Sequence, residues 1–444
     1  MTKFEQDKIG RKEIVDRIGL LVDNLQKDQH FCLALDGDWG SGKSFVLDMV
    51  EETLQTHKEY VIIKYDAWAN SFYSDPLIAI LSCLIDGIED KLYLVEQYAK
   101  KVKKAGKVTL NTLSKLSNKV NIFKSAIEGI KGIYNILHNP MSMAGLEEFK
   151  SYQDLLKETK QVLNNITTTR EYRGKQTKLI ILVDEIDRCL PDEQLKILER
   201  LHHLFDVKNC VVICAVNKKS IIKNFKTTYG GNGEEYLRKF FDYNVRLGTK
   251  GDLYLSYLLQ DDLCSRLEKI FPAEQMKQNF DYITGRKMTP CQVVDRAHHY
   301  ILELVEKNNL QYIISNREIS RYYDNLLAVI DEFGWKNWGS QYLFFVIFGL
   351  FINKFLKHQF FVENKTNNPI EELKLHLNTS QNSYTREIEY DDICINDFKN
   401  TVLKMRKRQD WQDHSYGEIA AGDEFYKLGL LIIRYGGQDE YNER

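Results

Sequence analysis

The sequence predicts an α/β fold, in which a parallel sheet of five strands carries helices on both faces. Five short apolar runs alternate with longer segments of helical spacing, which is the pattern of a parallel sheet with crossover helices. The expected strands are residues 31–36, 60–65, 179–184, 210–216 and 242–247. Only 6 prolines occur in 444 residues, so few positions interrupt the intervening helices. A further helix is expected at 7–21, before the first strand.

The composition is that of a folded globular protein. Hydrophobic residues make up 43% of the chain and charged residues 28%, which argues against extensive disorder. The net charge of −2 does not favour binding to nucleic acid. The longest apolar run, 342–352, is too short to span a membrane, and the first residues lack the apolar segment of a secretory signal. We therefore expect a cytosolic protein whose eight cysteines are reduced and form neither a metal site nor a disulfide framework.

The segment after the first expected strand matches a phosphate-binding loop. Gly37, Gly42, Lys43 and Ser44 fit the pattern G-x-x-x-x-G-K-[ST]. Glycines let backbone N–H groups turn inward around phosphates, and the start of the next helix adds partial positive charge. Lys43 is expected to contact the β- and γ-phosphates, and the Ser44 hydroxyl to bind Mg²⁺. The other predicted loop residues are Asp38, Trp39, Gly40, Ser41 and Phe45.

The expected strand at 179–184 ends in an acidic pair, which is the second half of such a site. We expect Asp184 to hold Mg²⁺ and Glu185 to orient and polarise the attacking water. Another expected strand, 60–65, lies between the two motifs in the sequence. This division is typical of ATPases and predicts the spatial strand order 5-1-4-3-2.

A third motif follows the strand expected at 210–216. The residues Asn217-Lys218-Lys219-Ser220 resemble the guanine-binding motif of GTPases, but the last position lacks the carboxylate that binds guanine. The sequence therefore favours ATP over GTP. Asn217 is instead expected at a strand tip, near the γ-phosphate or the attacking water.

Several segments together resemble the KAP family of P-loop NTPases. The most specific is ILVDEIDRCLPDE at 181–193, which is similar to the extended acidic motif of that family. Similar segments are LDGDWGSGKS in the phosphate loop, YDAWANSFYSDPLIAI, EEYLRKFFDYNVRL and NREISRYYDNL. The resemblance implies an ATPase domain followed by a helical lid. It also implies a link to plasmid or phage exclusion, as for bacterial members, or a scaffold at a membrane, as for animal members.

The resemblance further assigns three arginines. Arg188 matches the arginine after the acidic motif, and Arg317 and Arg321 match arginines of the lid. Such groups would sense or stabilise charge on the γ-phosphate, from the same chain or from a second one. This chain has Glu185 where the family usually has Asp, and Asn217 where Asp is frequent. Its lid motif also lacks the usual proline.

A long insertion at 91–170 separates the two phosphate-site motifs. Apolar residues between 113 and 137 recur at alternating spacings of three and four, which predicts a heptad seam. Residues 91–135 contain ten lysines and two glutamates, a net charge of +8. Three interpretations remain open: a helical hairpin folded on the core, a helix lying on an anionic membrane surface, or a seam for a protein partner, a second copy or a nucleic-acid backbone.

These observations predict an ATP- and Mg²⁺-dependent NTPase that acts as a conformational switch and has four regions. They are the NTPase core at 1–90 and 171–250, the basic insertion at 91–170, a helical lid at 251–361 with a buried helix at 343–356, and a polar region at 362–444. The expected location is the cytoplasm, with contact to the inner face of the membrane left open. The alternative is a nucleotide-gated scaffold that does not hydrolyse ATP, and a nucleic-acid translocase is less favoured.

Overall fold

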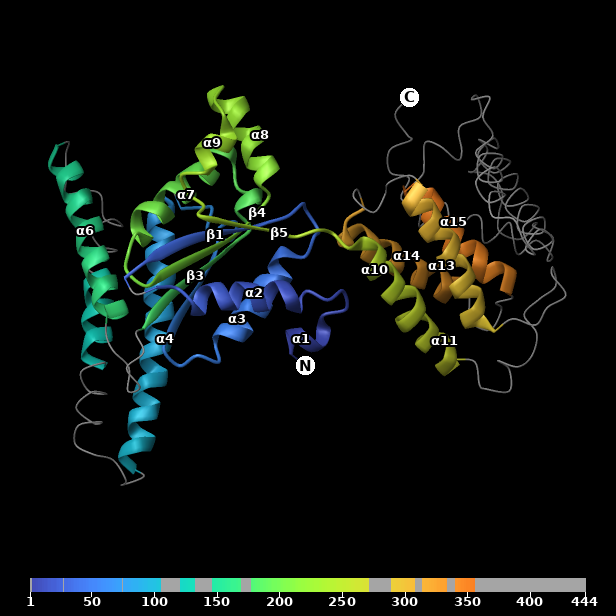
Figure 1. Ribbon diagram of the computed structural model, residues 1–444, viewed down its shortest axis with the longest axis horizontal. Coiled ribbons are helices and arrows are strands. Elements are labelled where there is room, and N and C mark those ends of the chain that lie inside the picture. The colour runs from blue at the N-terminus through green and yellow to red at the C-terminus, as the bar shows by residue number, and fades with distance from the viewer. Residues whose placement is uncertain are drawn as a thin grey trace, which may run out of the picture. The chain divides into compact units, whose positions relative to one another are not determined.

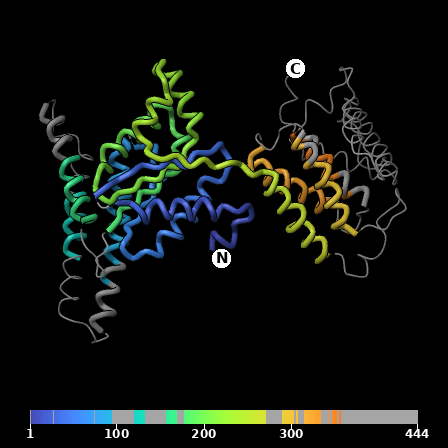
Figure 2. The backbone as a smooth tube through the Cα atoms, in the orientation of Figure 1, coloured from blue at the N-terminus to red at the C-terminus, as the bar shows by residue number. Residues whose placement is uncertain are grey.

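The computed structural model of the protein describes nine segments of the chain. They are residues 2–26, 28–73, 75–104, 120–131, 146–168, 177–270, 289–307, 314–333 and 340–355. The chain divides into two compact units, Met1–Gly248 and Thr249–Arg444 (Figure 1). Figure 2 traces the same backbone from end to end.

A five-stranded parallel sheet forms the centre of the first unit. Its strands lie in the order β2-β3-β4-β1-β5, which confirms the predicted order read from the other edge. The strands are β1 (His30–Asp36), β2 (Tyr60–Asp66), β3 (Lys178–Asp184), β4 (Cys210–Val216) and β5 (Tyr243–Arg246). The central strand β4 is buried at every position, as expected for a strand covered on both faces.

Helices cover both faces of this sheet (Figure 1). One core cluster joins the sheet to α2 (Lys12–Asp23) and α3 (Lys43–Leu54). The cluster on the other face includes side chains from helices further along the unit. These are α4 (Pro76–Lys104), α6 (Leu146–Thr168), α7 (Pro191–Phe205), α8 (Lys218–Tyr229) and α9 (Gly233–Leu237). Alternation along β1 explains the two clusters, since Leu33 and Leu35 face one core and Ala34 faces the other.

The helix predicted at 7–21 begins later in the structure, at Lys12. Instead of one helix at 7–21, a short α1 (Lys3–Gln6) precedes α2. The Asp7 carboxylate accepts hydrogen bonds from the backbone N–H groups of Arg11 (2.6 Å) and Lys12 (3.0 Å), and Gly10 has a φ of 68°. Side-chain acceptors of this kind satisfy the first amides of a helix, so α2 begins only after Arg11.

Part of the insertion packs on the core. Residues 120–131 are helical, and Phe123, Ile127 and Ile130 of the expected seam are buried in the same cluster as the sheet. Lys131 pairs with Glu89 of α4 at 2.5 Å. For these residues the contacts favour the hairpin interpretation. The seam positions Leu113, Leu116, Tyr134 and Leu137 lie outside the described residues.

The described part of the second unit is helical. It comprises α10 (Gly251–Ser256), a π-helical segment η3 (Tyr257–Leu263), α11 (Cys264–Ile270), α13 (Pro290–Lys307), α14 (Asn316–Phe333) and α15 (Ser340–Phe355). Ile301, Leu326 and Ile347 are fully buried where α13, α14 and α15 form one core, so the buried helix expected at 343–356 is confirmed. Residues 362–444 lie outside the described segments. None of the described helices is both long and apolar enough to cross a lipid bilayer.

Candidate functional site

The predicted phosphate loop joins β1 to α3. Gly40 and Gly42 have φ values of 77° and 90°, which residues with a Cβ rarely adopt. Gly42 precedes α3, and no described side chain caps the first amides of this helix. A Cβ at Gly42 would meet nothing within 4 Å, so there is space beside the loop. Uncapped amides beside open space at the start of a 12-residue helix fit a phosphate group.

Gly37 closes the start of the loop tightly against the segment after β5. A Cβ here would lie 2.5 Å from the Ser41 Oγ atom and 3.0 Å from the Leu247 carbonyl oxygen. Gly37→Ala is therefore expected to lower the free energy of unfolding by about 1–3 kcal/mol, measured by urea denaturation. Gly248→Ala is the matched control, because a Cβ there meets nothing within 4 Å and the expected change is close to zero. Equal stability of the two variants would contradict this close packing.

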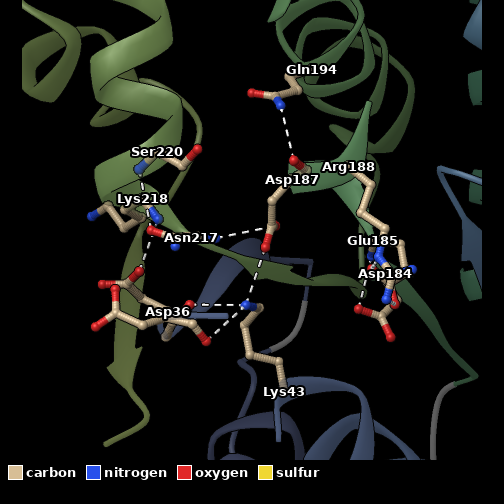
Figure 3. A network of polar contacts seen from close by, with 12 residues as sticks. Asp36, Lys43, Asp184, Glu185, Asp187, Arg188, Gln194, Asn217, Lys218 and Ser220 are labelled. Atoms are coloured by element: carbon tan, nitrogen blue, oxygen red, sulfur yellow. Dashed lines mark hydrogen bonds and ion pairs between the residues drawn. The ribbon is translucent and has the colours of Figure 1, made fainter. Parts of the chain in front are cut away.

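Lys43 is held between the loop and the segment after β3 (Figure 3). Its ammonium group donates to the Gly37 carbonyl at 2.9 Å and lies 3.1 Å from a carboxylate oxygen of Asp187. Both side chains are largely buried, at 10% and 4% exposed. Asp187 also accepts a hydrogen bond from the Asn217 backbone N–H at 3.2 Å, so this carboxylate connects Lys43 to the end of β4.

The acidic pair lies at the carboxyl end of β3. The Asp184 carboxylate accepts a hydrogen bond from the Glu185 N–H at 2.8 Å. Glu185 has a φ of 60°, which is uncommon for a residue with a side chain. Arg188 donates to its carboxylate through Nη2 at 2.7 Å and also contacts it through Nε. Partial burial and the neighbouring Asp184 raise the pKa of Glu185, while Arg188 opposes that rise.

The oxygen atoms at this edge of the sheet suit Mg²⁺. Asp184 supplies a carboxylate after β3, and Ser44 supplies an exposed hydroxyl in the first turn of α3. Carboxylate and hydroxyl oxygens are the hard ligands that Mg²⁺ takes beside phosphate. The residues therefore fit the predicted ion, and its ligands remain a prediction.

The other predicted loop residues occupy varied surroundings. Trp39 is 58% exposed, and Ser41 is fully buried. Asp38 pairs with Lys219 at 3.4 Å. Phe45 lies beneath the ammonium group of Lys3, which is 5.6 Å from the ring centre. We expect the backbone groups of these four residues, rather than their side chains, to contact a bound phosphate.

Two predicted phosphate contacts have other partners in the structure. The Asn217 side-chain oxygen accepts a hydrogen bond from the Ser220 N–H at 3.2 Å and caps α8. The Arg188 guanidinium pairs with the Glu185 carboxylate. Contact of either group with a γ-phosphate remains a prediction.

The predicted lid arginines lie in the second unit. Arg317 and Arg321 are exposed and one turn apart on α14. This helix needs no proline at its start, because Ser315 and Glu318 cap it reciprocally, with hydrogen bonds of 2.8 and 3.2 Å. A role for these arginines in the site remains a prediction.

Sequence reasoning assigned no role in the site to three acidic residues at this edge of the sheet. Asp187 pairs with Lys43, as described above. Asp36 accepts a hydrogen bond from the Lys218 N–H at 2.9 Å and so fixes the start of α8. Asp66 lies opposite Asp184 in the β2–β3 register. Two of the three carried a signal, since Asp36 and Asp66 each end a strand, as the predicted Asp184 does.

The strand order, the loop after β1 and the acids after β3 define the core of a P-loop NTPase. The family model for the KAP family P-loop domain matches residues 11–333, and the chain belongs to this family. An uncharacterised protein of Methanocaldococcus jannaschii is 26% identical over 169 residues, which cover 34% of this chain and 86% of that protein.

Two solved structures align with this chain at low similarity. Caenorhabditis elegans PCH-2 aligns with a TM-score of 0.33 and 8% identity, over 78% of this chain and 70% of that one. Cdc6p from Pyrobaculum aerophilum aligns with a TM-score of 0.33 and 11% identity, over 84% of this chain and 93% of that one. The assignment of the family rests on the match to residues 11–333.

Proposed function

We propose that this protein binds ATP with Mg²⁺, hydrolyses the γ-phosphate and uses the nucleotide state as a conformational switch. The observation that carries the proposal is that the side chains of Lys43 and Glu185 both pair with residues of the single turn that follows β3. Lys43 pairs with Asp187, and Glu185 pairs with Arg188, within the short segment η2 (Ile186–Arg188) and its flank. This segment thus holds the lysine and the glutamate together at one edge of the sheet.

The residues divide the proposed chemistry between them. Lys43 and the amides at the start of α3 bind the phosphates, and bound Mg²⁺ would neutralise charge on them through Asp184 and Ser44. Glu185 accepts a proton from a water molecule while the oxygen of that water attacks the γ-phosphorus. The bond between the γ-phosphorus and the oxygen that bridges it to the β-phosphate breaks, and ADP leaves. The raised pKa of Glu185 makes it a stronger base than an ordinary carboxylate.

The choice of nucleotide is tested by calorimetric titration with ATP, GTP and ADP, each with Mg²⁺ and with a chelator. We expect ATP to bind more tightly than GTP, and removal of Mg²⁺ to weaken ATP binding. Asn217 supports the preference, because its side-chain oxygen caps α8 and its motif ends in Ser220 rather than a carboxylate. Tighter binding of GTP would contradict the assignment.

Arg188 is expected to set the pH dependence of turnover. Its positive charge lowers the pKa of Glu185, so Arg188→Gln should raise that pKa further. Because a general base acts when deprotonated, the acid limb of the kcat/KM profile should move to higher pH. Arg188→Lys keeps the charge and is the matched control. A lower rate with an unmoved acid limb would favour a direct contact between Arg188 and phosphate.

The alternative is a nucleotide-gated scaffold that binds ATP without hydrolysing it. Binding without turnover, with anionic liposomes or DNA present as well as absent, would support it. A role in defence against phage, or in exclusion between plasmid and phage, is a separate hypothesis that rests on the family resemblance. Phage challenge of cells with and without the gene tests it, and equal plaque counts across a broad panel would contradict it.

A further inference from the structure

Arg11 is a buried cation that the proposed chemistry does not use. It stands immediately before α2 and is 1% exposed. Burial lowers its pKa to about 10, against the opposing influence of Asp7, so the guanidinium is charged at neutral pH. A buried charge is costly unless hydrogen bonds replace its contacts with water, so the partners of Arg11 define its role.

One nitrogen of Arg11 connects two distant parts of the chain. Nη2 donates to the Ser41 carbonyl at 3.0 Å, within the phosphate loop. It also donates to the Gly248 carbonyl at 2.5 Å, shortly after β5. Gly248 is the last residue of the first unit, and the chain enters the second unit at Thr249. The backbone of Arg11 is itself fixed by the Asp7 carboxylate at 2.6 Å.

The first of these bonds orients an amide of the phosphate loop. The C=O of Ser41 and the N–H of Gly42 belong to one peptide plane, and the peptide bonds of the described residues are all trans. In a trans peptide these two groups point in opposite directions, so a donor that fixes the carbonyl also fixes the amide. The Ser41 hydroxyl is buried and has no hydrogen-bond partner in the described residues. The side chain of Ser41 therefore does not provide this anchor, and Arg11 does.

The second bond acts at the connection between the units. The C=O of Gly248 shares its peptide plane with the N–H of Thr249, by the same geometry. A few residues further on, the backbone is fixed within the second unit. A Cβ at Gly251 would lie 3.0 Å from the Ile314 carbonyl oxygen, so the start of α10 is closely packed there. The peptides around 248–250 therefore form the connection at which a hinge between the units would lie.

We propose that Arg11 is a positioning residue that couples the phosphate loop to the connection between the two units. Phosphates bound to the loop amides restrain the Ser41–Gly42 peptide, and Arg11 transmits this restraint to the Gly248–Thr249 peptide. The arrangement of the second unit thereby depends on nucleotide. This inference rests on the proposed binding of ATP and names the path by which the switch operates. Coupling is reciprocal, so loss of Arg11 weakens ATP binding as well.

The test measures the distance between the units with and without nucleotide. Spin labels are attached to non-canonical amino acids at Thr228 on α8 and Asp324 on α14, which are exposed positions. Distance distributions are recorded with Mg²⁺ and a non-hydrolysable ATP analogue. Arg11→Met removes the donors at similar length, and Arg17→Met on the exposed side of α2 is the matched control. ATP affinity of each variant is measured by titration.

We expect the analogue to shift the distribution in the natural protein and in Arg17→Met, but not in Arg11→Met at saturation. We also expect Arg11→Met to bind the analogue roughly 5-fold or more weakly. An equal shift in Arg11→Met would overturn the inference. Binding to the natural protein without any shift would also overturn it, while the proposed nucleotide binding would stand. No binding to the natural protein would refute the proposed function itself.

A second measurement needs no variant and applies if Arg11→Met does not fold. Hydrogen exchange is followed by mass spectrometry in peptides that cover residues 245–252, with and without the analogue. Protection of the Thr249 amide on binding is expected, because its peptide plane becomes restrained. Unchanged exchange in this segment, alongside protection in the phosphate loop, would overturn the coupling.

Discussion

Glu185→Gln is expected to stop ATP turnover and to leave ATP binding intact. The glutamine is isosteric but cannot accept the proton of the attacking water, and loss of a general base lowers a rate by roughly 10²- to 10⁴-fold. Binding should persist because Lys43 and the loop amides are unchanged. The measurement is phosphate release at saturating ATP, together with a calorimetric titration of the same sample.

Glu13→Gln serves as the control, because Glu13 is 83% exposed on α2 and pairs only with Arg17 in the salt bridges of the described residues. It should retain full turnover. Comparable turnover in the Glu185→Gln protein and the natural protein would assign the base to another residue. Loss of ATP binding in Glu185→Gln would indicate a structural role for the Glu185–Arg188 pair.

Lys43→Ala is expected to have two large effects, on ATP affinity and on stability. Loss of a charge-assisted hydrogen bond to phosphate costs about 2–3 kcal/mol, which corresponds to roughly 30- to 150-fold in Kd. The substitution also leaves the Asp187 carboxylate, 4% exposed, without its cation. Removal of one partner of a buried pair lowers the free energy of unfolding by about 3 kcal/mol. Titration and urea denaturation measure the two effects.

A double-mutant cycle separates these two effects. Asp187→Ala combined with Lys43→Ala removes both charges, so the double variant should recover part of the stability lost in Lys43→Ala. ATP affinity should stay low in the double variant. Lys219→Ala is the control, because Lys219 pairs with a half-exposed carboxylate at 3.4 Å and should cost under about 1 kcal/mol. Additive stability losses for Lys43 and Asp187 would contradict the pairing.

The sheet was predictable because its signals are local and consistent. All five strands lie within one residue of their predicted limits at each end, and β5 is the one that is shorter than expected, by one residue at each end. Continuous apolar runs such as 210–216 require burial on both faces, which a covered parallel sheet provides. The start of α2 was not predictable from periodicity, since it depends on a turn in which the Asp7 side chain bonds to Arg11 and Lys12.

The site was predictable in its motifs but not in its pairings. The phosphate loop pattern identifies Lys43 as the residue that contacts phosphate. The acidic pair after β3 is identified because an NTPase site needs a ligand for Mg²⁺ and a general base. Lys43 pairs with Asp187, which lies 144 positions further along the chain. Such a contact is set by the order of strands and by the turn after β3. No periodicity encodes it, and the same holds for the contact of Arg11 with Ser41.

In the proposed function, one site at the carboxyl edge of the sheet binds Mg²⁺–ATP and cleaves it. The decisive experiment is single-turnover cleavage of γ-labelled ATP by excess protein, with Mg²⁺ or chelator and with anionic liposomes or DNA added. We predict Mg²⁺-dependent phosphate release by the natural protein, and an additive that raises the rate would identify the partner of the basic insertion. Bound ATP that remains intact under every condition would contradict the claim.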